Sequence, residues 1–179
     1  MEICLKSTVS FEELKNIMFD IGFKVQEDFQ MNDIYMINKD VIFKDNILVR
    51  ETVGKKILLV NKIKELDDNG IVIGERSIKC PITDSESGYK FLCSIGYKKV
   101  FELRDHNLLV TNGVNEIYIQ DVEGLGTYIE MEQKNLLLKE TNGDSIDGLV
   151  NTIKKYNLPL DYSNISVKKS LEMLKIICK

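Results

Sequence analysis

The stretch that decides the fold is residues 116–132, EIYIQDVEGLGTYIEME, two alternating runs around a Gly-Leu-Gly corner. Side chains alternate between the two faces of a strand, so Ile129 and Met131 share one face while Glu130 and Glu132 share the other. The two glycines give the backbone the freedom that a tight connection needs. Two carboxylates on one face repel each other unless water, a base or a metal lies between them. The stretch therefore predicts a hairpin with an apolar face and an acidic face, the latter either solvated or part of a site.

Composition places the chain among ordinary globular proteins. Its 179 residues are 44% hydrophobic and 29% charged, which fits a single domain over residues 1–179 with a real core. The net charge of −4 gives no case for binding nucleic acid or an anionic membrane. No apolar run is long enough to span a bilayer, and the sequence opens with Glu2 rather than a basic, apolar signal. We expect a cytoplasmic protein, monomeric or homodimeric.

The four cysteines show no spacing typical of a metal site. Cys4, Cys80, Cys93 and Cys178 are far apart in the sequence, and each lies in an apolar element. The sequence therefore predicts buried thiols in a reducing compartment.

The rest of the chain alternates helices with strand meanders. Helices are predicted to start at Ser10, Asp84, Asp144 and Ser166, with Ser10 and Asp144 as capping residues. Strands are predicted at 2–6, 33–37, 47–51, 57–62, 75–82, 100–104 and 107–111, besides the hairpin, with a turn at 67–70 and His106 in a polar turn. Both halves read as a helix followed by a meander, a weak internal duplication. The pattern is typical of an α+β protein with a largely antiparallel sheet. Alternation alone leaves a sandwich and a helix-covered barrel equally open.

Three motifs resemble one family. The segment VEGLGTYIEME at 122–132 resembles the LDEVEGLGxFVEIE signature of the CYTH superfamily, which contains class IV adenylate cyclases and thiamine triphosphatases. EICLK at 2–6 resembles the family's ExExK strand, and KSLEML at 169–174 resembles its KSYxELL ending. The resemblance covers essentially the whole chain. It implies a closed eight-stranded antiparallel β-barrel, a triphosphate tunnel, with amphipathic helices packed outside.

The resemblance also implies a set of site residues, which we expect to point into one cavity. A triphosphate needs arginine and lysine donors from several directions, and Mg²⁺ or Mn²⁺ needs hard oxygen ligands. The residues that match triphosphate-binding positions are Lys6, Arg50, Lys62, Arg104 and Lys169, and those that match metal positions are Glu2, Glu130 and Glu132. The resemblance does not identify a catalytic residue.

Several family positions are altered in this chain. They are Cys4, Leu48, Glu75, Ser77, Glu102 and Gln120. A thiol or an amide is a poor substitute for a carboxylate toward Mg²⁺ or Mn²⁺. Glu75 and Glu102 replace positive residues, which either weakens triphosphate binding or gives Lys79 and Arg104 a structural partner. The residues leave both alternatives open.

Three functions therefore remain. The first is a metal-dependent enzyme acting on ATP or another nucleotide or organic triphosphate. It would be an adenylate cyclase of class IV, which is a phosphorus-oxygen lyase, or a triphosphate phosphohydrolase acting on thiamine triphosphate or tripolyphosphate. The second is a binding module that has lost turnover. The third is a protein that uses its outer surface for partners and binds no triphosphate.

Overall fold

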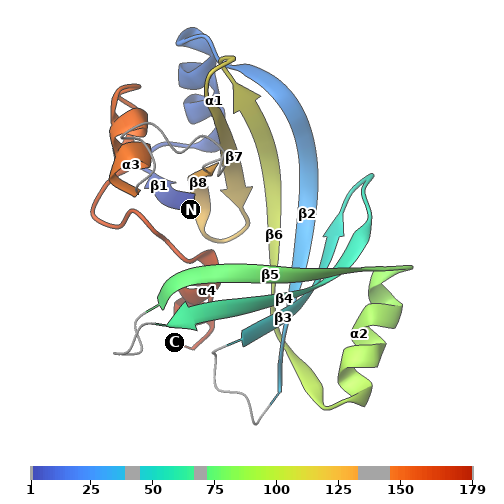
Figure 1. The fold of residues 1–179 in the computed structure, drawn as a ribbon. Coiled ribbons are helices and arrows are strands. Elements are labelled where there is room, and N and C mark those ends of the chain that lie inside the picture. Colours follow the sequence, from blue (N-terminus) through green and yellow to red (C-terminus); the bar gives the residue numbers. More distant parts are fainter. Residues whose placement is uncertain (1, 39–44, 67–71, 133–145, 179) are drawn as a thin grey trace, which may run out of the picture. The chain divides into compact units, whose positions relative to one another are not determined.

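The computed structural model describes residues 2–38, 45–66, 72–132 and 146–178. Those residues form an α+β fold with four helices and a large sheet (Figure 1). The strands are β1 (Glu2–Ser7), β2 (Lys24–Asn38), β3 (Asp45–Thr52), β4 (Ile57–Leu66), β5 (Val72–Ile82), β6 (Tyr97–Thr111), β7 (Glu116–Val122), β8 (Gly126–Glu132) and β9 (Leu160–Asp161). The helices are α1 (Phe11–Asp20), α2 (Ser85–Ser94), α3 (Ile146–Lys154) and α4 (Lys169–Ile177).

The strand order is β5-β4-β3-β2-β6-β7-β8-β1-β9. Every strand pairing whose register is described is antiparallel, as the sequence predicts. The resemblance implies eight strands, which correspond to β1–β8, and the two-residue β9 lies beside β1 in addition. No pairing between β5 and β9 is present among the described residues. The large antiparallel sheet is therefore confirmed, whereas closure into a barrel stays a prediction.

The chain divides into two compact units, and the first comprises Met1–Asp28 and Asp105–Lys179. Its core lies between one face of the sheet and helices α1 and α3. Ile3, Leu5 and Ile129 contribute from the strands, Leu14 from α1 and Ile153 from α3, and all five are fully buried. Ile129 and Met131 thus face the helices, as the alternation of the hairpin predicts. Their neighbours on β8, including Glu130, consequently lie on the opposite face of the sheet.

The second unit is Phe29–Arg104, and it repeats this arrangement around α2. Met36, Val49 and Leu92 are the buried centre of its core, with Ile82 packed against them. Asp84 caps α2 by accepting a hydrogen bond from the Ser87 amide at 2.7 Å. Each unit thus has a helix over the apolar face of its strands, whereas the internal duplication stays a prediction.

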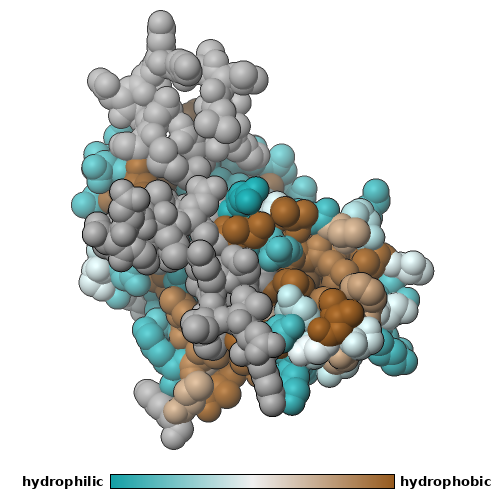
Figure 2. Space-filling view, turned by 60° about the horizontal axis from the view of Figure 1, so that its bottom comes forward, coloured by the Kyte–Doolittle hydropathy of each residue, from teal (hydrophilic) through white to brown (hydrophobic). Residues whose placement is uncertain are grey.

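Hydrophobic side chains also reach the surface. In the second unit Ile78, Phe91 and Ile95 are each more than half exposed. Figure 2 shows hydrophobic and hydrophilic side chains interspersed on the face turned forward.

Some sequence expectations were wrong. Two strands were expected at 100–104 and 107–111, but β6 runs unbroken through His106, which contacts Asp28 at 2.7 Å instead of lying in a turn. Of the four cysteines only Cys4 is buried; Cys80, Cys93 and Cys178 are exposed. An apolar sequence neighbourhood does not fix which way one side chain points, because the faces of strands and helices alternate.

Two further expectations concern other segments. The turn at 67–70 and the cap at Asp144 lie outside the described residues. Among the helices that are described, none has the length and apolar character to cross a membrane.

Candidate functional site

The sheet face opposite the core of the first unit carries a polar row that crosses four strands. In register, Asn107 of β6 lies opposite Gln120 of β7, which lies opposite Tyr128 of β8, which lies opposite Lys6 of β1. Directly opposed residues of antiparallel strands project to the same face. Two residues further along β8 than Tyr128, Glu130 lies opposite Cys4 of β1. The local alternation of the sequence therefore gathers these groups on one surface.

Lys169 is brought to this face by a backbone contact of β1. Cys4 donates its amide hydrogen to the Ile165 carbonyl at 3.1 Å and accepts from the Val167 amide at 2.9 Å. The chain is thereby held beside β1, and α4 begins two residues later at Lys169.

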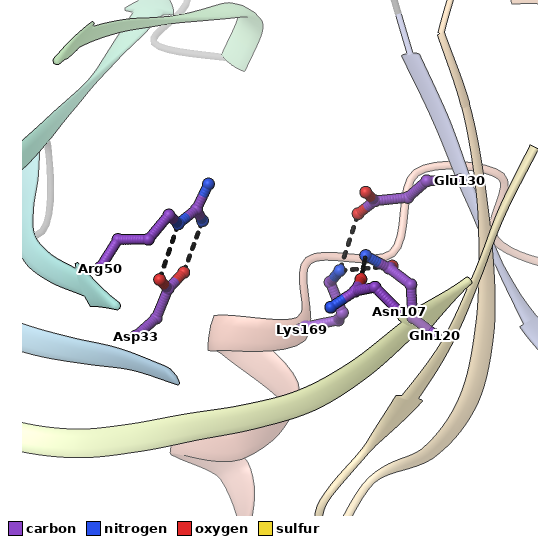
Figure 3. Close-up of polar contacts among 6 residues, drawn as sticks. All are labelled: Asp33, Arg50, Asn107, Gln120, Glu130 and Lys169. Atoms are coloured by element: carbon purple, nitrogen blue, oxygen red, sulfur yellow. Dashed lines mark hydrogen bonds and ion pairs between the residues drawn. The ribbon is translucent and has the colours of Figure 1, made fainter. Parts of the chain in front are cut away.

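The ammonium of Lys169 is held by two oxygen atoms. It donates to Gln120 Oε1 at 2.6 Å and to Glu130 Oε1 at 2.8 Å (Figure 3). Gln120 in turn donates through Nε2 to Asn107 Oδ1 at 2.8 Å. Burial lowers the pKa of Lys169, but the carboxylate of Glu130 and other negative groups outweigh it and raise the pKa above its ordinary value. Lys169 is therefore charged.

Two buried hydrogen-bond donors on the same row have no hydrogen-bond partner among the described residues. They are Tyr128 Oη and Asn107 Nδ2, whose residues are 0% and 1% exposed. Burial raises the pKa of Tyr128 to about 12, so the hydroxyl keeps its proton. A buried donor without an acceptor is costly, and most native structures supply one. The row therefore offers two donors and a cation to an acceptor-rich ligand.

The three predicted metal residues lie on this face, but they do not form a site. Glu2 lies directly opposite Glu132, and Glu130 is two residues away on β8. Glu130 contacts Lys169, and Glu2 lies 3.7 Å from Lys168 Nζ. Within the described part of the chain, no group of three His, Cys, Asp or Glu residues could hold a metal ion. The carboxylates are the right ligands for Mg²⁺ or Mn²⁺, but their arrangement does not fit one.

Cys4 and Gln120, two of the altered positions, are part of this face. Cys4 is buried opposite Glu130, and burial, followed by the charge of Glu130, raises the pKa of its thiol to about 12. A neutral thiol does not replace the missing carboxylate. The side-chain oxygen of Gln120 accepts a hydrogen bond from Lys169. With a thiol at position 4 and an amide at position 120, Glu130 has the ammonium of Lys169 as a charged contact.

Lys6 lies at the end of the polar row. Its Nζ is 5.5 Å from the centre of the Tyr128 ring, within the range of a cation–π contact. Its predicted role in holding a triphosphate stays a prediction.

In the second unit, Arg50 forms a bidentate ion pair with Asp33. Its Nε and Nη2 donate to the two carboxylate oxygens at 2.7 and 2.5 Å (Figure 3). Asp33 is 4% exposed. Two parallel bonds of this kind are among the strongest polar contacts in proteins. A triphosphate that binds Arg50 has to compete with this carboxylate.

The remaining predicted positions of this unit are spread over its sheet. Leu48 is fully buried on β3, and Lys62 lies opposite Ser77 of β5. The backbone of Glu75 lies opposite Lys64. The roles assigned to these residues stay predictions.

Glu102 and Arg104 pair with each other. Arg104 Nη2 donates to Glu102 at 2.9 Å, and Lys99 Nζ donates to the same carboxylate at 2.5 Å. Alternation from Phe101, which is buried and stacks on Tyr35, places Glu102 and Arg104 on the opposite face of β6. Tyr35 shares its face of β2 with Asp33. Because Arg104 contacts Glu102 on the face of β6 opposite Phe101, the geometry favours the alternative in which Glu102 is a structural partner of Arg104.

Asn107, Tyr128 and Asp33 were not selected from the sequence. The signal for Asp33 was a carboxylate directly before the apolar residues 34–37 of β2. The signal for Tyr128 was its alternation with Ile129, which places it beside Glu130. Asn107 had no usable signal, because its face depends on β6 being continuous.

The fold is shared with solved structures along nearly the whole chain. The PH1012 protein from Pyrococcus horikoshii OT3 superposes with a TM-score of 0.73 at 16% identity, over 96% of this chain and 98% of that one. A candidate adenylate cyclase from Vibrio parahaemolyticus gives 0.71 at 16%, over 98% and 97%. HpAC1 from Hippeastrum, a candidate adenylyl cyclase described with a dominant triphosphatase activity, gives 0.68 at 14%, over 97% and 94%. No protein-family model and no curated protein matches the sequence.

These likenesses define the fold. The chain shares the fold of these solved structures, among them candidate adenylate cyclases, and this agrees with the resemblance of its motifs to the CYTH superfamily.

Proposed function

We propose that this protein binds a nucleotide or organic triphosphate at the polar face described above and converts it. The observation that carries the proposal is the polar row with Tyr128 and Asn107, together with Lys169, which contacts Gln120 of that row. A buried ammonium and two buried donors without acceptors among the described residues suit the adjoining oxygens of a polyphosphate. Lys6 lies in the same row. The roles that the resemblance assigns to Arg50 and Lys62 stay predictions.

The reaction that we place first is the cyclisation of ATP, as in class IV adenylate cyclases. Such phosphoryl and nucleotidyl transfers proceed mainly by positioning the substrate and neutralising its charge. The lysine and the neutral donors of this face would supply the binding part of that task. Hydrolysis of a triphosphate is the second candidate, favoured by the likeness to HpAC1 and its described activity.

Dependence on Mg²⁺ or Mn²⁺ is part of the proposal. When bound, such an ion supplies charge neutralisation at the phosphate oxygens. Glu2, Glu130 and Glu132 are the residues proposed to hold it, after a rearrangement that releases Glu130 from Lys169. The alternative is a binding module without turnover. The Lys169–Glu130 ion pair favours it, because a carboxylate held by lysine is not available to a metal ion.

One panel of ligands tests the proposal. ATP, thiamine triphosphate and tripolyphosphate are titrated by calorimetry with Mg²⁺, with Mn²⁺ and with EDTA, and the products are resolved by chromatography. We expect binding of at least one ligand, and cyclic AMP with pyrophosphate from ATP. Release of orthophosphate would select the triphosphatase, and binding without product would select the binding module. No binding of any ligand would overturn the proposal and favour a role for the outer surface.

A matched pair of variants locates the site. Lys169→Met should weaken binding by tenfold or more, because a charge-assisted contact is lost. Lys175→Met removes the same charge from the exposed part of α4, and we expect it to leave the affinity within twofold. Equal effects of both substitutions would place the ligand elsewhere.

A further inference from the structure

Lys169 occupies a position that is unfavourable for a lysine unless something compensates it. It is the first residue of α4, where the helix dipole is positive, and its neighbour Lys168 is the N-cap and makes no side-chain capping bond. Its side chain is only 16% exposed. A buried cation at the positive end of a helix needs a strong partner, and Glu130 is that partner at 2.8 Å.

The contact with Lys169 also limits the ability of Glu130 to bind a metal ion. Its Oε1 accepts from Lys169, and so does the nearby Oε1 of Gln120. Cys4, directly opposite Glu130, contributes a neutral thiol. A divalent cation bound to Glu130 would therefore lie beside the Lys169 ammonium, and the two positive charges would repel each other.

We propose that Lys169 is an internal counter-ion that competes with divalent cations for Glu130. A metal ion gains the Glu130 carboxylate only when the ion pair opens. This inference rests on the proposed function, which places the metal ion on the polar face of the first unit, and it adds how Lys169 would regulate metal binding there. It explains why three carboxylates on one surface do not assemble into a metal site.

The inference is tested with Mn²⁺ alone, in the absence of any phosphate. Free Mn²⁺ is measured by electron paramagnetic resonance during titration of the full chain. We expect weak binding by the wild type and at least tenfold tighter binding by Lys169→Met. The control is Lys175→Met, which removes an equal charge from the same helix, where Lys175 lies 2.7 Å from Glu172 in an exposed pair. Equal shifts in both variants, or no shift in Lys169→Met, would overturn the inference.

A double-mutant cycle separates competition for Glu130 from a general effect of charge. Glu130→Gln alone should change Mn²⁺ affinity by less than twofold, because Lys169 already occupies the carboxylate. The same change made in Lys169→Met should abolish the gained affinity. A gain that persists without Glu130 would show that the metal binds elsewhere and would contradict the inference.

A second variant covers a loss of folding. Should Lys169→Met melt below the assay temperature, Lys169→Gln removes the charge while keeping a hydrogen-bond donor for Glu130, and the same tighter Mn²⁺ binding is expected. The two proposals fail separately. If tripolyphosphate binds but Lys169→Met and Lys169→Gln leave the Mn²⁺ affinity unchanged, only the counter-ion proposal is wrong. If these variants bind Mn²⁺ more tightly but tripolyphosphate does not bind, only the triphosphate proposal is wrong.

Discussion

At the scale of single residues, the polar contacts of this protein differ greatly in burial, and burial decides what each contributes. The Arg50–Asp33 pair is bidentate and has a buried carboxylate, with side-chain exposures of 21% and 6%. The Lys15–Glu12 pair has a similar length of 2.8 Å, but Glu12 is 68% exposed. Exposed pairs contribute little, whereas breaking a buried pair leaves a charge that water cannot reach.

We therefore predict that Asp33→Ala lowers the free energy of unfolding by roughly 3 kcal/mol. The physical reason is the loss of the bidentate partner of a largely buried guanidinium. Glu12→Ala is the control and should cost less than about 1 kcal/mol. Urea unfolding followed by circular dichroism measures both, provided the slope is unchanged. Similar losses in the two variants would mean that the Asp33 contact is no stronger than a surface pair.

Glu102 gives a prediction for pH. The hydrogen bond from Lys99, followed by the nearby positive charges, holds the pKa of this carboxyl below its ordinary value. A lowered folded-state pKa means that the stabilisation is complete above the unfolded-state pKa and is lost as pH falls through the folded-state pKa. Because this network is largely solvated, it is worth about 0.5–1 kcal/mol.

Wild type should therefore exceed Glu102→Gln in unfolding free energy by that amount at neutral pH. The difference should vanish in acid, where both side chains are neutral. Urea titrations across the acid range measure it. A difference that stays constant with pH would show that the carboxylate charge is not what stabilises this contact.

At the scale of elements, the sequence predicts faces better than it predicts lengths. Alternation placed Ile129 and Met131 in the core and Glu130 on the other face, because a strand has only two faces. The break in β6 was mispredicted, because Asp105, His106 and Asn107 look like turn residues. They lie in the strand because partners distant in sequence hold them, as Asp28 holds His106 and Gln120 holds Asn107.

The candidate site was predictable to a similar extent. The motifs identified Lys169 and Glu130 separately, but their contact depends on the pairing of Cys4 with residues 165–167. That pairing joins segments about 160 residues apart in the sequence, which no local pattern can specify. The sequence therefore indicated the charges of the site and not their partners.

Helix α2 packs on its sheet through a glycine, which gives a prediction at this scale. A Cβ built on Gly88 would lie 2.4 Å from Ile82 Cδ1. Gly88→Ala gains about 1 kcal/mol in helix propensity, but overpacking typically costs about 1–3 kcal/mol. We expect net destabilisation by roughly 1 kcal/mol from these two effects.

The sign should reverse when the obstructing methyl group is removed. Ile82→Val deletes Cδ1, so in that background Gly88→Ala should stabilise the protein by up to about 1 kcal/mol. Chemical unfolding of the four proteins in this cycle provides the measurement. Additive effects would mean that Ile82 moves aside without cost and that the glycine is not needed for packing.

At the scale of the whole molecule, two strands connect the two compact units. β2 begins before Asp28 and continues past Phe29, and β6 runs through Arg104 and Asp105. Each unit has its own core, centred on residues such as Leu14 in one and Val49 in the other. Each of these two strands therefore has residues in both units.

We predict one cooperative unfolding transition for the chain, because neither unit can lose its part of β2 and β6 without disturbing the strand that continues into the other. For 179 residues a single transition should absorb about 125 kcal/mol near 60 °C, at about 0.7 kcal/mol per residue. Calorimetry gives this enthalpy, and its ratio to the van't Hoff value tests the two-state condition. The unit-specific probes are Asp33→Ala in the second unit and Leu14→Ala in the first, and both should lower the same melting temperature. Two resolved transitions, each shifted by only one of these substitutions, would show that the units unfold independently and that strand continuity does not couple them.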